Sequence, residues 1–186
     1  MGWTIPGTVL QIQREDAAHI EDTFSSMFLA GGIVLSQVSA ITGLEPYTVQ
    51  NWVKRGLLSP PQGKRYTMRQ LCRICNINML KGVLPMERIC GMLGYINGQL
   101  DNEEDDVIDD SQLFFMFVKL AARVREMTDE QERQSLPQQI LAAYEEPIPG
   151  AKERVEKVMR IMLTAWVAER LRQEAEAMLD TITESK

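Results

Sequence analysis

Apolar residues recur every three to four positions along most of the chain, the spacing of amphipathic helices. The longest such stripe runs over residues 151–183, a segment without glycine or proline. The pattern predicts helices over residues 16–30, 36–42, 47–55, 67–81, 85–93, 113–124 and 151–183, and a shorter one that starts at Ser135. Residues 1–14 hold only scattered apolar positions and are expected to form a mostly irregular arm.

Glycine and proline divide the region before residue 67 into short pieces. Gly43 and Gly56 are expected to end two short helices, and Pro46 suits the first turn of the second. The stretch 57–66, rich in proline and glycine, lies between short extended pieces and is expected to form a small β-wing. Because no alternating strand pattern appears elsewhere, the predicted fold class is all-α with a small β-wing.

Two predicted helices begin with capping residues. Ser36 is expected to cap the first short helix. Thr67 and Gln70 have the spacing of a capping box at the start of the helix that follows the wing.

The charge of the whole chain argues against a nucleic-acid partner, but its distribution does not. The 186 residues carry a net charge of −6. Residues 36–100 hold eight Lys and Arg against two acids and so carry +6, whereas residues 1–35 carry −3 and residues 101–186 carry −9. Such segregation is typical of a nucleic-acid-facing module joined to a different kind of module.

Composition narrows the class of protein further. The longest apolar run, near residues 27–35, is about ten residues long and contains two glycines, so no membrane span is expected. Three cysteines and a start without signal-peptide features favour a reducing, cytoplasmic location. The Cys72-x-x-Cys75 pair is expected to pack in the core, because a zinc site wants four ligands. A chain with one histidine and no phosphate-binding loop is expected not to be an enzyme and to need no metal or cofactor.

Two further features leave alternatives open. The acidic run 101–110 is expected to be a solvated linker that also supplies helix-capping charge, and the sharper alternative is that it screens the basic region when DNA is absent. Phe114, Phe115 and Phe117 are expected to be core residues, the alternative being a small-molecule pocket beside them.

Two short helices joined by a glycine-containing turn, then a hairpin and another helix, are the order of elements in a winged helix-turn-helix. In the second helix, Val49 and Trp52 are expected to face inward. The residues expected to read bases are Gln50, Asn51 and Thr48. The residues expected to contact phosphates are Tyr47, Lys54, Arg55, Lys64, Arg65 and Tyr66.

At these positions the chain resembles MerR-type helix-turn-helix proteins. The matching residues are Gly43-Leu44, Thr48-Val49, Gly56-Leu57-Leu58, Pro60 and Arg65-Tyr66. It also resembles, over about residues 8–125, the bacterial proteins called domain of unknown function 1836, themselves thought to be MerR-like. The residues similar to that family are Thr48–Gly56, Lys64–Tyr66, Ile77–Lys81, Tyr95–Gly98 and Asp105-Asp106. Glu45 departs from the usual Ser or Asp cap. Gln50, Asn51 and Trp52 stand where MerR proteins usually carry Arg followed by aromatic residues.

The resemblance implies a DNA-binding fold and favours a transcriptional regulator that reads double-stranded DNA. The alternative is a protein-interaction adaptor that uses the helix-turn-helix without DNA. The expected organisation is an N-terminal arm and helix (1–33), a MerR-like module (34–98), an acidic linker (99–110) and a helical dimerisation or regulatory region (111–186). The long C-terminal helix is expected to pair two copies of the chain, and a small-molecule effector is compatible with this role.

Overall fold

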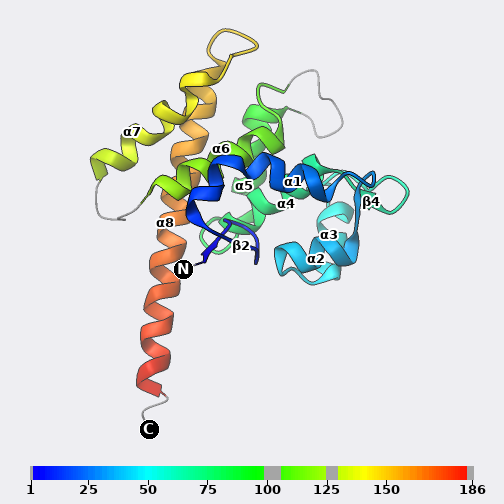
Figure 1. Cartoon of the computed structure of the whole chain (residues 1–186), viewed down its shortest axis with the longest axis horizontal. Helices are drawn as coiled ribbons and strands as arrows, with labels where there is room; N and C mark the ends of the chain where they lie inside the picture. Colours follow the sequence, from blue (N-terminus) through cyan, green and yellow to red (C-terminus); the bar gives the residue numbers. More distant parts are fainter. Residues whose placement is uncertain (1, 99–105, 125–129, 184–186) are drawn as a thin grey trace.

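The computed structural model describes residues 2–98, 106–124 and 130–183. These residues are mostly helical, with small antiparallel sheets, as the hydrophobic spacing predicts (Figure 1). In chain order the elements are β1 (Trp3–Thr4), β2 (Gln11–Ile12), η1 (Arg14–His19), α1 (Ile20–Met27), β3 (Ile33–Val34), α2 (Leu35–Thr42), α3 (Pro46–Lys54), β4 (Arg65–Tyr66), α4 (Met68–Leu80), α5 (Met86–Asn97), α6 (Asp110–Arg123), α7 (Glu130–Ile140), η2 (Leu141–Ala143) and α8 (Ala151–Thr183). None of the helices in these ranges is long and apolar enough to cross a membrane.

The N-terminal region is more ordered than the sequence predicts. Strands β1 and β2 form an antiparallel pair in which Trp3 lies opposite Ile12. The remaining residues from 2 to 13 are turns and irregular backbone, as expected for a mostly irregular arm. The helix expected over 16–30 is divided into the 3₁₀ helix η1 and the shorter α1. Strands of two residues are too short to show an alternating pattern, which explains why the sequence does not reveal them.

The starts of the helices agree more closely with the capping residues in the sequence than the N-terminal strands do with its hydrophobic pattern. The capping box of α4 is confirmed: the Gln70 backbone N–H donates to Thr67 Oγ1 at 3.2 Å, and the Thr67 N–H donates to Gln70 Oε1 at 2.9 Å. At α2 the N-cap is Val34, so Ser36 lies inside the first turn and the predicted cap is wrong. Gln37 Oε1 accepts the Val34 N–H at 3.0 Å in its place. Helix α7 begins before the predicted start at Ser135 and contains Pro137.

Helix α4 lies at the centre of the fold and packs against α2, α5, α6 and α8. Leu71, Cys72, Ile74 and Cys75 are fully buried. The aromatic residues of α6 also belong to the core, since the rings of Phe114 and Phe115 lie 5.3 and 5.5 Å from the ring of Phe24. The preferred interpretation of these phenylalanines as core residues is therefore confirmed.

The start of α6 is bound to α4 by ion pairs. Asp109 caps α6 through the Ser111 N–H at 2.7 Å, and Asp110, 1% exposed, lies 3.2 Å from Arg73. Arg69 of α4 pairs with Asp106 and lies 3.4 Å from Asp109. The expectation that the acidic run is solvated is thus wrong for Asp106 and Asp110, while its residues 101–105 lie outside the described residues.

Helix α8 is one continuous helix of 33 residues, which confirms the prediction for 151–183. Its two halves lie in different surroundings. Val155, Val158 and Met162 are buried against the body, whereas Leu171 and Met178 are 50% and 59% exposed. The C-terminal half projects away from the other helices (Figure 1).

Replacing Asp110 by Asn is expected to lower the free energy of unfolding by about 3–5 kcal/mol, because the Arg73 guanidinium would stay buried without its counter-charge. Urea denaturation measures the change. Asp22→Asn is the matched control: the Asp22 side chain is 87% exposed, and its replacement is expected to cost less than about 0.5 kcal/mol. Equal effects of the two substitutions would contradict a stabilising role for this ion pair.

Candidate nucleic-acid interface

The candidate recognition helix is α3, and the turn before it has a clear sequence cause. Gly43 adopts a φ of +71° at the end of α2, a left-handed conformation that glycine reaches without steric cost. Glu45 is extended at the N-cap of α3, and Pro46 occupies its first turn, where no backbone N–H is needed. The connection between α2 and α3 is therefore only three residues long.

Helix α3 buries one face and exposes the other. Val49 is fully buried and Trp52 is 3% exposed, as the spacing predicts. Thr48 is half-buried. On the outer face, the exposed side chains are Tyr47, Gln50, Asn51 and Lys54. The structure therefore brings the predicted base-reading residues Gln50 and Asn51 together on one exposed surface.

The stretch 57–66, which is predicted to form a wing, contains a tight turn at residues 62–65. Gln62 and Arg65 exchange backbone hydrogen bonds of 3.1 and 2.9 Å, and Gly63 and Lys64 have φ values of +54° and +64°. Two successive positive φ values are those of a type I′ turn, which favours glycine or asparagine at both positions. Lys64 is the non-glycine residue with positive φ among the described ranges, and its side chain is exposed at the tip.

The chain after this turn pairs with a distant strand. Arg65 and Tyr66 form β4, which runs antiparallel to β3, with Tyr66 opposite Ile33. The Arg65 guanidinium also donates to the Gly32 carbonyl at 2.7 Å. Both β3 and β4 contact α2, so α2 supports α3 and the wing together.

Tyr66 does not suit the role predicted for it. Its side chain is 3% exposed and belongs to the core, and burial raises its pKa. The prediction that its hydroxyl contacts a phosphate is wrong for this conformation, because the ring packs inward beside β3. Arg65, the residue before it, points to solvent because neighbouring residues of a strand face opposite sides.

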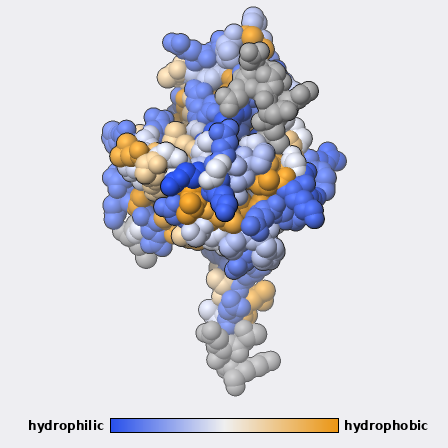
Figure 2. Space-filling model, turned by 90° about the vertical axis from the view of Figure 1, so that its right-hand side faces the viewer, coloured by the Kyte–Doolittle hydropathy of each residue, from blue (hydrophilic) through white to orange (hydrophobic). Residues whose placement is uncertain are grey.

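Six of the eight cations of residues 36–100 fall into two groups. Arg69 and Arg73 are turned inward and pair with the aspartates at the start of α6. Lys54, Arg55, Lys64 and Arg65 are exposed around α3 and the wing. Arg55 lies 3.7 Å from Glu87, and the exposed Glu45 adds a negative charge beside the first turn of α3. Figure 2 looks onto this side of the molecule and shows hydrophilic side chains flanking a hydrophobic band.

Two of the cysteines are core residues. Cys72 and Cys75 are fully buried, and burial raises the pKa of both thiols. Within the described ranges, no group of three or more His, Cys, Asp or Glu side chains is arranged to hold a metal ion. The predicted core role of these two cysteines is confirmed.

Sequence reasoning missed two features of this surface. The positive φ of Lys64 could have been found from the Gln-Gly-Lys-Arg order between extended pieces, since such turns favour glycine. The inward orientation of Arg69 and Arg73 carried no local signal, because their partners lie 37 residues further along the chain.

Comparison with known proteins finds a family match for part of the chain. Residues 32–117, from β3 into α6, match the family model "Domain of unknown function (DUF1836)". An 80-residue segment is 29% identical to the uncharacterized protein YkrK of Bacillus subtilis (strain 168) and covers 41% of this chain. The matched segment spans about a third (34%) of that protein's length. No solved structure matches the chain.

Replacing Lys64 by Gly is expected to leave the free energy of unfolding unchanged or to raise it by up to about 1 kcal/mol, because glycine adopts positive φ without a Cβ clash. Gly63→Ala in the same turn is the matched control. It is expected to cost about 1 kcal/mol, although its new Cβ would meet no atom within 4 Å. Thermal and urea denaturation measure both, and a clear drop in the stability of Lys64→Gly would contradict the turn geometry.

Proposed function

We propose that this protein is a DNA-binding regulator of transcription that contacts double-stranded DNA through α3 and the wing, in the manner of a winged helix-turn-helix. The observation that carries this proposal is the outer face of α3. Gln50, Asn51 and Lys54 are exposed there, while Val49 and Trp52 hold the opposite face in the core. A helix must combine these two faces to enter a major groove and remain folded.

The exposed side chains suit two kinds of DNA contact. Asn and Gln can each pair with the edge of an adenine through two hydrogen bonds, which assigns base reading to Gln50 and Asn51. Half-buried Thr48 would lie at the margin of that contact. Lys54, Arg55 and Lys64 would neutralise phosphates, and so position the helix without reading sequence.

Arg65 would have two roles. Its bond to the Gly32 carbonyl holds the wing against β3, and its exposed guanidinium adds a further positive charge toward the phosphates. A substitution of Arg65 would therefore disturb both the turn and DNA binding. Lys64 is the better test residue, because its side chain lies at the tip of the turn.

We further propose that the protein acts as a homodimer through the exposed half of α8. A row of exposed residues follows the alternating three- and four-residue spacing of a coiled-coil seam: Ile161, Thr164, Ala168, Leu171, Ala175, Met178 and Ile182. This row is about 30 Å long. A second copy of the chain carries the same row, so a two-fold pair of α8 helices would cover it on both protomers.

The competing role is that of an adaptor that binds another protein through α3. One observation favours it: the Tyr47 ring is 70% exposed on the same face, and aromatic residues are common anchors of protein interfaces. Salt distinguishes the two roles, because contacts with phosphates release counterions and contacts with an apolar anchor do not.

The DNA proposal predicts that the full chain retains genomic DNA fragments and that its affinity falls by orders of magnitude between ~50 and ~200 mM salt. Lys64→Gly is expected to weaken binding to all sequences and to make the slope of log affinity against log salt shallower by about 1, because one phosphate is no longer neutralised. Asn51→Ala is expected to relax discrimination at one base pair by about 1–3 kcal/mol. Selection of bound fragments followed by fluorescence anisotropy measures both effects.

Arg88→Gln serves as the charge-matched control, because Arg88 is exposed on α5, outside α3 and the wing. No retained DNA at the lowest salt would overturn the proposal. A partner protein that is retained independently of salt, and that Tyr47→Ala no longer retains, would favour the adaptor role.

The dimer proposal predicts that the wild-type chain sediments as a dimer and that Leu171→Glu gives monomers with unchanged stability, because Leu171 makes no contribution to the buried core. Ala177→Glu adds the same charge on an exposed position outside the row and is expected to remain dimeric. Analytical ultracentrifugation measures this. A monomeric wild-type chain, or equal behaviour of the two variants, would refute pairing through this face.

A further inference from the structure

A cavity lies between η1, α6 and α7. Its volume is about 730 Å³, within the range of small-molecule sites. Residues from η1 and from α7, more than 100 positions apart in sequence, line it together. The small-molecule pocket considered from the sequence was expected beside Phe114–Phe117, and those side chains fill the core instead.

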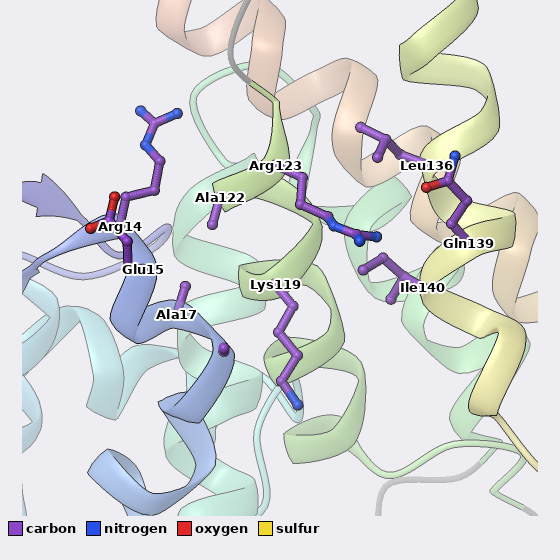
Figure 3. A pocket seen from close by; sticks show the side chains of 10 residues that line it. Arg14, Glu15, Ala17, Lys119, Ala122, Arg123, Leu136, Gln139 and Ile140 are labelled. Carbon is purple, nitrogen blue, oxygen red and sulfur yellow. The ribbon is translucent and has the colours of Figure 1, made fainter.

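Three cations line the cavity, and they come from two elements. Lys119 and Arg123 lie one turn apart on α6, and Figure 3 shows Arg123 extending toward Leu136 and Ile140 of α7. Arg14 of η1 lines the other side, where its guanidinium donates to the Val124 carbonyl at 3.4 Å.

Arg123 differs from these neighbours in its pairing. Lys119 pairs with Glu21 at 2.7 Å, whereas the side chain of Arg123 makes no ion pair or hydrogen bond with any residue of the described ranges. Among the three cations, two are offset by Glu15 in the lining and by Glu21. The remaining single positive charge matches one carboxylate better than a phosphate dianion.

The wall beside Arg123 is apolar. Leu136 is 4% exposed, and Ile140 and Ala122 are half-buried around the opening. A guanidinium can hold a carboxylate through two parallel hydrogen bonds, while an apolar wall takes a hydrocarbon or aromatic body. The site therefore combines one charged anchor with an apolar surface.

We propose that this cavity binds a small amphipathic carboxylate, with its carboxylate on Arg123 and its apolar body against Ala122, Leu136 and Ile140. The binding does not depend on whether α3 contacts DNA, so it can be measured on the full chain alone. Lys119 is given no contact with the ligand, since Glu21 already pairs with it.

Isothermal titration calorimetry with phenylacetate and with octanoate tests the proposal. Each carboxylate is compared with its neutral amide. At least one carboxylate is expected to bind saturably, and its amide is not. Arg123→Gln is expected to weaken binding by about tenfold or more. Arg88→Gln, the same charge change at a residue that does not line the cavity, is expected to leave binding unchanged.

A second variant tests the place of binding without removing charge. Ala122→Phe is expected to fill the cavity and to abolish binding, with the fold verified by circular dichroism. The proposal is overturned if neither carboxylate binds at ~10 mM, where even a millimolar site is mostly occupied. It is equally overturned if Arg123→Gln and Arg88→Gln bind alike, if Ala122→Phe binds like the wild type, or if phenyl phosphate binds more tightly than phenylacetate.

Discussion

The buried guanidinium of Arg73 holds three parts of the chain together. Its Nε donates to the Leu57 carbonyl at 3.2 Å, in the segment that leaves α3, and its Nη1 lies 3.2 Å from the carboxylate of Asp110 at the start of α6. Asn76, one turn later on α4, donates to the Asp110 carbonyl at 3.2 Å. Burial raises the pKa of Asp110 and Arg73 opposes that shift, so the positive charge of Arg73 offsets part of the cost of burying the carboxylate. The exit of α3, the centre of α4 and the entry to α6 are thus positioned by one side chain.

These ion pairs change what the charge distribution along the chain says about the protein surface. The positive excess of residues 36–100 belongs partly to the interior, because Arg69 and Arg73 face aspartates of the acidic run. The surface around α3 retains Lys54, Arg55, Lys64 and Arg65, with Glu87 close to Arg55. Charge counted by segment correctly separates basic from acidic regions, but it does not tell a surface cation from a structural one.

Residues close together in sequence predicted the helices well, but they did not predict which distant segments pair with each other. The capping box at Thr67 and Gln70, the glycine stop at Gly43 and the unbroken length of α8 all depend on residues within a few positions of one another. The β3–β4 pair joins residues more than 30 positions apart, and Tyr66 is buried because of it. The exposure of Gln50 and Asn51 could be predicted from helical spacing alone. The cavity could not, since Arg14 and Arg123 line the same space only because α6 packs on η1.

Helix α8 packs on the body of the protein in its first half and is exposed in its second, and the helix is continuous between the two. Val167 is still buried against the body, and Leu171, four residues later, is half exposed. Each added residue turns a helix by about 100°, so the number of residues between these two positions sets the direction in which the outer row faces. The orientation of any partner bound to the end of this helix therefore depends on how far α8 has rotated about its axis at that point. Inserting or deleting one residue would change this rotation, whereas no substitution along the row would alter it.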